Sequence, residues 1–107
     1  MTTFYKNAKV DLASTAATTL YTTPVAKVAV FKSLLVSEDS GNADTITVTL
    51  TNAAGTVFSL FKVKAVAANT TVELLAQPLV VEESEILKVT AATANRLHVV
   101  GSYVEIS

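Results

Sequence analysis

The chain has 107 residues, a mass of 11.2 kDa and a formal net charge of −1, so it fits one domain with a modest hydrophobic core. Half of its residues are hydrophobic and 16 % are charged, while cysteine is absent and histidine occurs once. These values exclude disulfides, cysteine-based metal or iron–sulfur sites and any site that needs two imidazoles. The slightly acidic balance also provides no electrostatic footprint for nucleic acid.

The start of the sequence carries no pattern of a targeting or membrane segment. Residues 1–14 are polar, with Lys6, Lys9 and Asp11, and they lack the apolar stretch of a signal peptide. No apolar run approaches the roughly 18 residues that a transmembrane helix needs. We therefore expect no membrane association.

Valine and threonine are abundant, and their β-branched side chains pack well on a pleated surface, so the composition favours strands. The N-terminal pattern is the weakest. Residues 4–12 are compatible with a strand, but residues 1–17 could equally form an extended arm that becomes ordered on a partner's surface. Leu20 to Pro24 then reads as a short strand that ends at the proline.

The next two segments carry the clearest strand patterns. Residues 26–37 are apolar at both parities, which is typical of a central strand or of a strand at a subunit contact. In residues 44–52, Ile46, Val48 and Leu50 alternate with four threonines, which predicts one apolar face and one wettable face. The polar loop between these segments predicts that they form a hairpin or an adjacent pair.

The second half of the chain reads as further short strands. The parity of residues 56–65 changes near Leu60, which predicts a β-bulge or a bend there. Further strands are predicted at residues 71–75, 79–81, 85–90 and 96–106. The total is about seven or eight short strands. The sequence thus predicts an all-β fold, a single antiparallel β-sandwich over residues 1–107 that is jelly-roll-like or immunoglobulin-like.

Three carboxylates, Glu82, Glu83 and Glu85, lie between two apolar runs in the segment LVVEESEILKV, residues 79–89. Paired carboxylates can act as general acid and base, and clustered carboxylates can bind Ca²⁺. Strand alternation, however, directs Glu82 and Glu83 to opposite sides, and no calcium-loop spacing accompanies them. We interpret the segment as a polar hairpin or crossover turn between two core strands, with a weak cation site or catalysis as lesser alternatives.

The second acidic group, Glu38, Asp39 and Asp44, flanks Ser, Gly and Asn residues in the loop SEDSGNAD. Such side chains commonly accept hydrogen bonds from nearby backbone groups, so this loop is also interpreted as a turn. His98 could belong to a catalytic triad, but no G-x-S-x-G motif is present. An exposed strand face or a subunit contact is the favoured interpretation of His98.

Basic residues could form a strip for single-stranded nucleic acid on a β-surface: Lys62, Lys64, Lys88 and Arg96. Phe58 and Phe61 alternate with core-like residues there, and the net charge is negative, so a solvated face is favoured. The three glycines, at positions 41, 55 and 101, are too dispersed for a phosphate-binding loop. We therefore assign no catalytic, cofactor-binding or metal-binding residue and expect a protein that is not an enzyme.

Four segments resemble a group of small all-β virion proteins of tailed bacteriophages: TTLYTTP (18–24), VAVFKSLLVSE (28–38), ANTTVELLAQPLVVEESEILKV (68–89) and VVGSYVEIS (99–107). That group typically has a Leu-Tyr-Thr-x-Pro segment, then Ala-x-Thr-x-x-Glu-Leu-Leu before Pro-Leu-Val, a glycine–acid turn and Leu-x-Val. This chain departs from the pattern at the turn, where Glu83-Ser84-Glu85 replaces the more usual Gly-Asp.

The resemblance implies a non-enzymatic structural protein of the virion, assembled in the host cytoplasm, that decorates or cements the capsid. Its implied partners are the major capsid protein or other virion proteins and further copies of itself, a trimer being the simplest guess. A tail, connector or fibre-base component is the alternative within this class. A carbohydrate- or receptor-binding adhesion module is the alternative from another class, and Tyr21 and Tyr103 side by side on an open surface would favour it.

Overall fold

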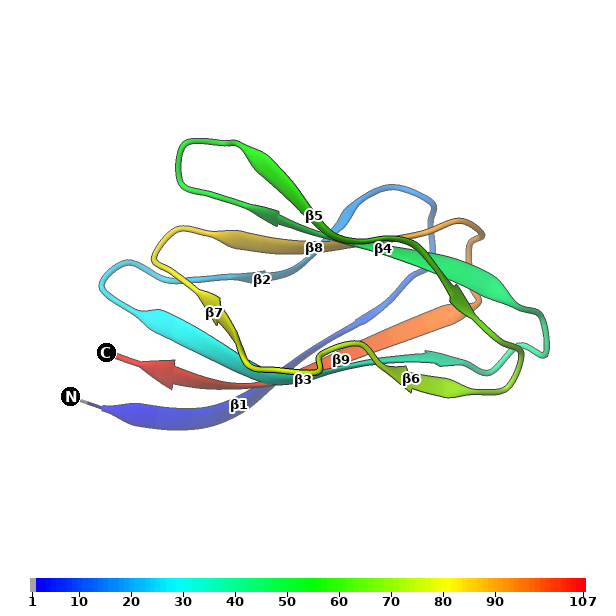
Figure 1. Ribbon diagram of the computed structural model, residues 1–107, viewed down its shortest axis with the longest axis horizontal. Coiled ribbons are helices and arrows are strands. Elements are labelled where there is room, and N and C mark those ends of the chain that lie inside the picture. The colour runs from blue at the N-terminus through cyan, green and yellow to red at the C-terminus, as the bar shows by residue number, and fades with distance from the viewer. Residues whose placement is uncertain (1) are drawn as a thin grey trace.

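The computed structural model describes residues 2–107, which form nine β-strands and no helix (Figure 1). The strands are β1 (Thr3–Asp11), β2 (Thr18–Thr22), β3 (Val28–Glu38), β4 (Asp44–Thr51), β5 (Val57–Val66), β6 (Thr71–Glu73), β7 (Leu79–Val81), β8 (Ile86–Ala91) and β9 (Leu97–Ile106). Across this part of the chain, no helix is long and apolar enough to span a bilayer.

The strands pack as two antiparallel sheets, which Figure 1 shows one above the other. Sheet A has the order β1-β9-β3-β6, and β7 also pairs with β3; sheet B has the order β2-β8-β4-β5. Early and late strands therefore lie next to each other in both sheets, which is the jelly-roll arrangement. The predicted β-sandwich is confirmed, with nine strands rather than seven or eight, and it is the jelly roll of the two alternatives.

Two expectations from the sequence need correction, one about the pairing of two strands and one about the N-terminal segment. Residues 26–37 and 44–52 were predicted to pair, but β3 lies in sheet A and β4 in sheet B, so the loop between them crosses from one sheet to the other. Of the segment considered as an extended arm, residues Thr3–Asp11 form β1, which pairs with β9 along its whole length. Met1 lies outside the described residues.

The core fills the space between the sheets with aliphatic side chains and a few aromatic rings. Its fully buried members with the largest side chains are Phe31, Leu12, Leu34, Ile46, Leu87 and Leu97. The alternation predicted for residues 44–52 is confirmed, because Ile46 and Val48 are buried while Thr45, Thr47 and Thr49 are only partly buried. Burial of apolar surface from both sheets is the main force that holds the sandwich together.

Bulges change which side chains of β3 and β5 face the core. A register shift in β3 between Phe31 and Ser33 brings Leu34 onto the same inner face as Phe31, which simple alternation does not predict. The bulge predicted near Leu60 is confirmed, since β5 shifts register against β4 there and again towards Lys64. The shift in β3 keeps apolar side chains inside on both sides of the bulge, whereas Val57, Phe58 and Val63 of β5 remain exposed.

An aromatic cluster joins the two sheets, with Tyr21 from β2 and with Phe31 and Tyr103 from β3 and β9. The ring of Phe31 stacks on Tyr103 at a centroid distance of 4.8 Å and meets Tyr21 edge-on at 5.4 Å. Gly101 makes room for this cluster, because a Cβ at that position would lie 2.7 Å from Cε2 of Phe31. Glycine is therefore required at position 101, because the ring of Phe31 leaves no room for a side chain there.

Candidate functional site

The buried carboxylate of Glu38 organises the loops at one end of the sandwich. It accepts hydrogen bonds from the backbone N–H groups of Ser40 (2.8 Å), Gly41 (3.1 Å) and Asn69 (3.1 Å), and from the hydroxyl of Ser40. The Ser40 hydroxyl bond and the three N–H groups lower the pKa of Glu38 to about 2, against the opposing effect of burial. Glu38 thus works as an internal cap for two loops.

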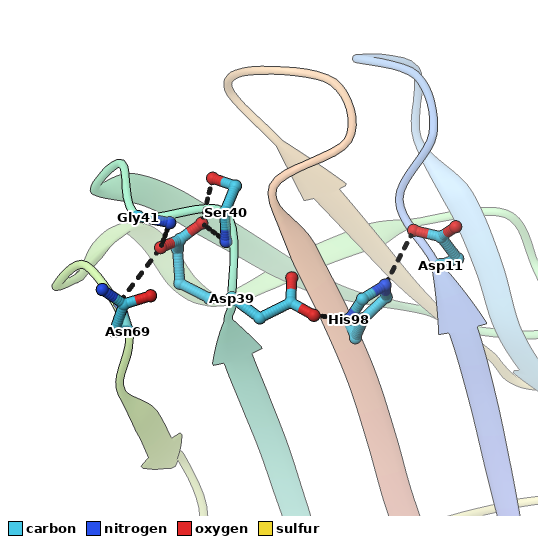
Figure 2. Close-up of polar contacts among 7 residues, drawn as sticks. Asp11, Asp39, Ser40, Gly41, Asn69 and His98 are labelled. Carbon is cyan, nitrogen blue, oxygen red and sulfur yellow. Dashed lines mark hydrogen bonds and ion pairs between the residues drawn. The ribbon is translucent and has the colours of Figure 1, made fainter.

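His98, on β9, lies between two aspartates at the same end of the molecule, as Figure 2 shows. Its Nε2 is 3.2 Å from Oδ1 of Asp11, and its Nδ1 is 3.7 Å from Oδ2 of Asp39. Both aspartates are exposed, whereas His98 is half-buried. The imidazole thus connects β1, β9 and the loop after β3, and its two nitrogens face different carboxylates. Both of these contacts of the imidazole are with carboxylates, and neither is with a serine or threonine hydroxyl that could act as a nucleophile.

The acidic turn of Glu82, Glu83 and Glu85 connects β7 in sheet A to β8 in sheet B. It is therefore a crossover turn and not a hairpin. Oε1 of Glu85 accepts from the N–H of Glu82 at 2.8 Å, while Oε2 of Glu83 accepts from the N–H of Ala26 at 2.6 Å. The three carboxylates do not converge on one point, and two of them are engaged by backbone donors.

Glu73, which the sequence did not single out, fits into the bulge of β3. Oε2 accepts from the N–H of Leu34 (2.7 Å) and of Leu75 (3.2 Å), and Oε1 accepts from the hydroxyl of Ser33. Burial by itself would raise the pKa of Glu73, but these hydrogen bonds outweigh it and lower the pKa. The acid satisfies the backbone N–H group of Leu34, which lies opposite the gap between β6 and β7 and so has no strand partner there.

Glu105 is a second group that sequence reasoning missed. Its side chain is 3 % exposed, and it faces the interior from β9. Oε2 accepts from the Tyr21 hydroxyl at 2.7 Å, and Oε1 lies 3.2 Å from Nζ of Lys6 and 3.3 Å from Nζ of Lys27. The signal was present in the parity of β9, where Glu105 shares the inward face with Val99 and Tyr103.

The surroundings of Glu105 change the pKa values of three groups. The Tyr21 hydrogen bond, opposed by burial and helped by the two lysines, lowers the pKa of Glu105. Burial, with the nearby carboxylate, raises the pKa of both Tyr21 and Tyr103. The network therefore holds a carboxylate charged and two phenols neutral, which stabilises the fold and leaves no group poised near neutral pH for proton transfer.

Of the four basic residues considered as a strip, Lys62, Lys64 and Lys88 lie on β5 and β8 of sheet B, whereas Arg96 lies in the loop between β8 and β9. Lys62 falls at the β5 bulge, without a partner in β4, and Arg96 donates from Nη1 to the carbonyl of Ala43 at 2.9 Å. Lys88 lies opposite Thr19 and Thr49 in the middle of sheet B. Within residues 2–107, no group of three or more His, Asp or Glu side chains is arranged to hold a metal ion.

The outer face of sheet A carries an apolar row that crosses four strands. Tyr5, Val104, Val30 and Val80 lie opposite one another on β1, β9, β3 and β7. At the two ends of the row, Tyr5 is 84 % and Val80 is 52 % exposed. A shallow hollow of about 440 Å³ lies beside the row, lined by Tyr5, Asn7, Lys32 and Ser102 among others. Val104, in the middle of the row, is only 8 % exposed, so the exposed apolar surface lies at the two ends.

Comparison with known proteins shows the fold and not the family. No family model matches the chain, and no curated protein matches it. A solved structure described as "Bacillus endospore appendages form a novel family of disulfide-linked pili" aligns over 97 % of this chain and 86 % of that one, with a TM-score of 0.54 and 14 % identity. A structure of infectious bursal disease virus Gt strain aligns over 98 % of this chain and 30 % of that one, with a TM-score of 0.43 and 12 % identity. The chain therefore shares its β-sandwich with the subunit of a pilus.

Proposed function

We propose that this chain is a non-enzymatic structural protein of a bacteriophage virion, which decorates or cements the capsid through contacts with itself and with the major capsid protein. The observation that carries the proposal is the apolar row Tyr5–Val104–Val30–Val80 on the outer face of sheet A. Tyr5 and Val80, at the two ends of the row, are exposed, and exposed apolar side chains on one face of a sheet are typical of a protein–protein contact.

The acidic groups support a structural role in a second way. Glu38, Glu73, Glu83 and Glu85 each accept hydrogen bonds from backbone N–H groups, so they hold loops and bulges in place. Glu38 and Glu73 are poor candidates for acid–base chemistry, because their lowered pKa values mean that the fold stabilises their charged form. Stability of the loops is what a subunit in a large particle requires.

The fold shared with a pilus subunit is compatible with assembly into a larger structure. The chain has no cysteine, so any assembly of it must rest on non-covalent contacts rather than on the disulfide links named for that pilus. The adhesion alternative is disfavoured, because Tyr21 and Tyr103 are each 8 % exposed and lie within the core. Neither ring is available to stack on a sugar.

The proposal is tested by mixing the purified protein with purified heads of a phage mutant that does not make this protein. A separate mixture uses the purified tails of the same mutant. Saturable binding to heads with a fixed stoichiometry is expected, measured by co-sedimentation and electron microscopy. Saturable binding to tails alone would move the protein to the tail or connector. Binding to neither particle would overturn the proposal.

A pair of charge substitutions makes this test specific to the surface. Val80→Glu places a carboxylate at the exposed end of the apolar row and should abolish head binding. Thr19→Glu places the same charge on the exposed outer face of sheet B, opposite Lys88, and should leave binding unchanged. Equal loss in both variants would show that the apolar row is not the contact.

A further inference from the structure

The outer edge of β1 is a sheet edge that no other strand of the described chain covers. β1 is the first strand of sheet A and pairs with β9 alone (Figure 1). Thr2 and Ser107 exchange two backbone hydrogen bonds, and Leu12 donates to Leu97, so the even-numbered residues direct their backbone groups towards β9. The odd-numbered residues direct theirs towards the open edge: Thr3, Tyr5, Asn7, Lys9 and Asp11.

The three other edge positions of the sandwich carry features that discourage strand addition. β5 has two register shifts, and β2 is five residues long with a shift of its own. β6 and β7 are three residues each, with Pro78 in the segment between them. Short strands, bulges and proline are the devices by which proteins protect sheet edges. β1 has none of them: its register against β9 runs without a shift for nine residues.

Lysines on an edge strand are another protective device, but those of β1 are already engaged. Nζ of Lys6 turns inward and contacts the buried Glu105 at 3.2 Å. Nζ of Lys9 donates to Oδ1 of Asn7, its neighbour on the same face, at 3.2 Å. Neither lysine therefore projects beyond the edge as an obstacle to an incoming strand.

We propose that β1 is an assembly edge at which two copies of the chain pair β1 to β1, antiparallel, about a two-fold axis at Asn7. In this register Asn7 faces its own counterpart, Tyr5 faces Lys9 of the second copy, and Thr3 faces Asp11. All five outward-directed residues then lie in hydrogen-bonded positions. The carbonyl of Asp11 already accepts from Ala13, and its second lone pair serves the new contact.

The side chains are complementary in this register. On one face Lys9 meets the ring of Tyr5, a cation against an aromatic surface, and the hydroxyl of Thr3 meets the carboxylate of Asp11. On the other face Phe4 meets Val10, so that two apolar residues cover each other. Phe4 is 47 % and Tyr5 84 % exposed in the single chain, and the contact would cover both. No pair of like charges is opposed.

This inference rests on the proposed function only in that both require the chain to self-assemble. It adds the strand and the residues through which two copies meet. A two-fold contact uses the same patch on both copies and closes as a dimer. It would join the two A sheets into one continuous sheet, extending the apolar rows side by side. It predicts a dimer, or an assembly built from dimers, in place of the trimer expected from the sequence.

The register is tested by single cysteines, because the chain has none of its own. Two facing residues in a hydrogen-bonded antiparallel pair have Cα atoms about 5.5 Å apart, within reach of a disulfide. Asn7→Cys should therefore give a covalent dimer under mild oxidation. Lys9→Cys is the control, since its two copies would lie about 13 Å apart along the strands and should stay unlinked. Equal linking of both variants, or linking of neither, would overturn the proposal.

The hydrogen bonding is tested by proline at the same position. Asn7→Pro removes an N–H group that points to the open edge and not to β9, so the fold should persist while the dimer is lost. Asn7→Thr keeps the N–H group and should remain dimeric. Sedimentation equilibrium from micromolar to near-millimolar protein measures the mass, and circular dichroism checks the fold. A wild-type chain that stays at 11.2 kDa throughout would overturn the proposal.

The two proposals fail separately. A monomeric protein that still binds phage heads would remove the β1 contact and leave the virion function intact. A dimer linked through Asn7→Cys that binds neither heads nor tails would support the β1 contact and remove the virion function. The solution experiments need no particle, so neither result depends on the other.

Discussion

The hydroxyl of Tyr21 donates a 2.7 Å hydrogen bond to Oε2 of Glu105 and so joins sheet B to sheet A inside the sandwich. Oε1 of the same carboxylate contacts Lys6 and Lys27, which are both partly exposed. A buried charge is tolerated only when it is paired and hydrogen-bonded. Glu105 meets both conditions, and Tyr21 supplies the hydrogen bond to one of its two oxygens.

Tyr21→Phe keeps the ring in the aromatic cluster but removes this hydrogen bond. The free energy of unfolding should fall by about 2 kcal/mol, because a hydrogen bond to a charged group contributes that much and Oε2 stays buried. Urea unfolding measures the change. Tyr103→Phe is the control, since the Tyr103 hydroxyl makes no hydrogen bond to Glu105 among the described contacts. A loss in the control as large as in Tyr21→Phe would contradict the role of the bond.

The pKa values of Glu38 and Glu105 predict acid sensitivity. Both are lowered in the folded chain, that of Glu38 from 4.5 to about 2, so the unfolded chain binds more protons between these limits. The stabilisation is therefore complete above about pH 4.5 and is lost as the pH falls towards 2. The urea concentration at the midpoint of unfolding should therefore decrease steadily as the pH is lowered across this range.

Glu38→Gln tests which carboxylate carries that dependence. An amide has one acceptor oxygen and one NH₂ group, so it cannot satisfy four donors at once, and the variant should be less stable at pH 7. Its stability should also change less between pH 4.5 and pH 2 than that of the wild type. An unchanged slope would show that Glu38 does not contribute to the acid transition.

Gly101→Ala should be destabilising for steric reasons. The added Cβ would lie 2.7 Å from Cε2 of Phe31, whose ring is itself stacked on Tyr103. Overpacking of this kind typically costs 1–3 kcal/mol, about 2 kcal/mol here. Phe31→Leu removes the ring edge, so the alanine should cost clearly less in that background. Additive effects in the double-mutant cycle would indicate a backbone cause instead.

The acidic crossover turn should tolerate loss of charge. Glu83→Gln and Glu85→Gln keep an oxygen that can accept from Ala26 and Glu82, so we expect the double variant to lose less than about 1 kcal/mol of stability. Glu83→Ala and Glu85→Ala remove the acceptors and should lose more. Loss of particle binding in the glutamine variant at unchanged stability would assign these charges to an interface.

Several properties of the fold are local and were predictable. The alternation around Ile46 and Val48 places one side of a strand in the core whatever its neighbours are, because the period of a strand is two. The bulge near Leu60 was visible for the same reason, as a change of parity within one segment. Turn chemistry likewise marked the acidic residues as loop components, and their backbone hydrogen bonds agree with that interpretation.

Other properties depend on which segments meet, and these the sequence left open. A polar loop ends a strand but does not say whether the next strand joins the same sheet, so β3 and β4 were placed together although they lie in different sheets. The bulge at Phe31 became visible only through the pairing of β3 with β9.

By itself, then, the sequence determined the all-β class, most of the strands and the absence of cysteine chemistry, because these follow from composition and short-range periodicity. Only the tertiary structure decided the jelly-roll order, the partners of Glu105 and the open edge of β1. Each of those depends on contacts between residues far apart in the chain, such as Tyr21 with Glu105, and a hydrogen bond or a free edge exists only once the strands have been placed.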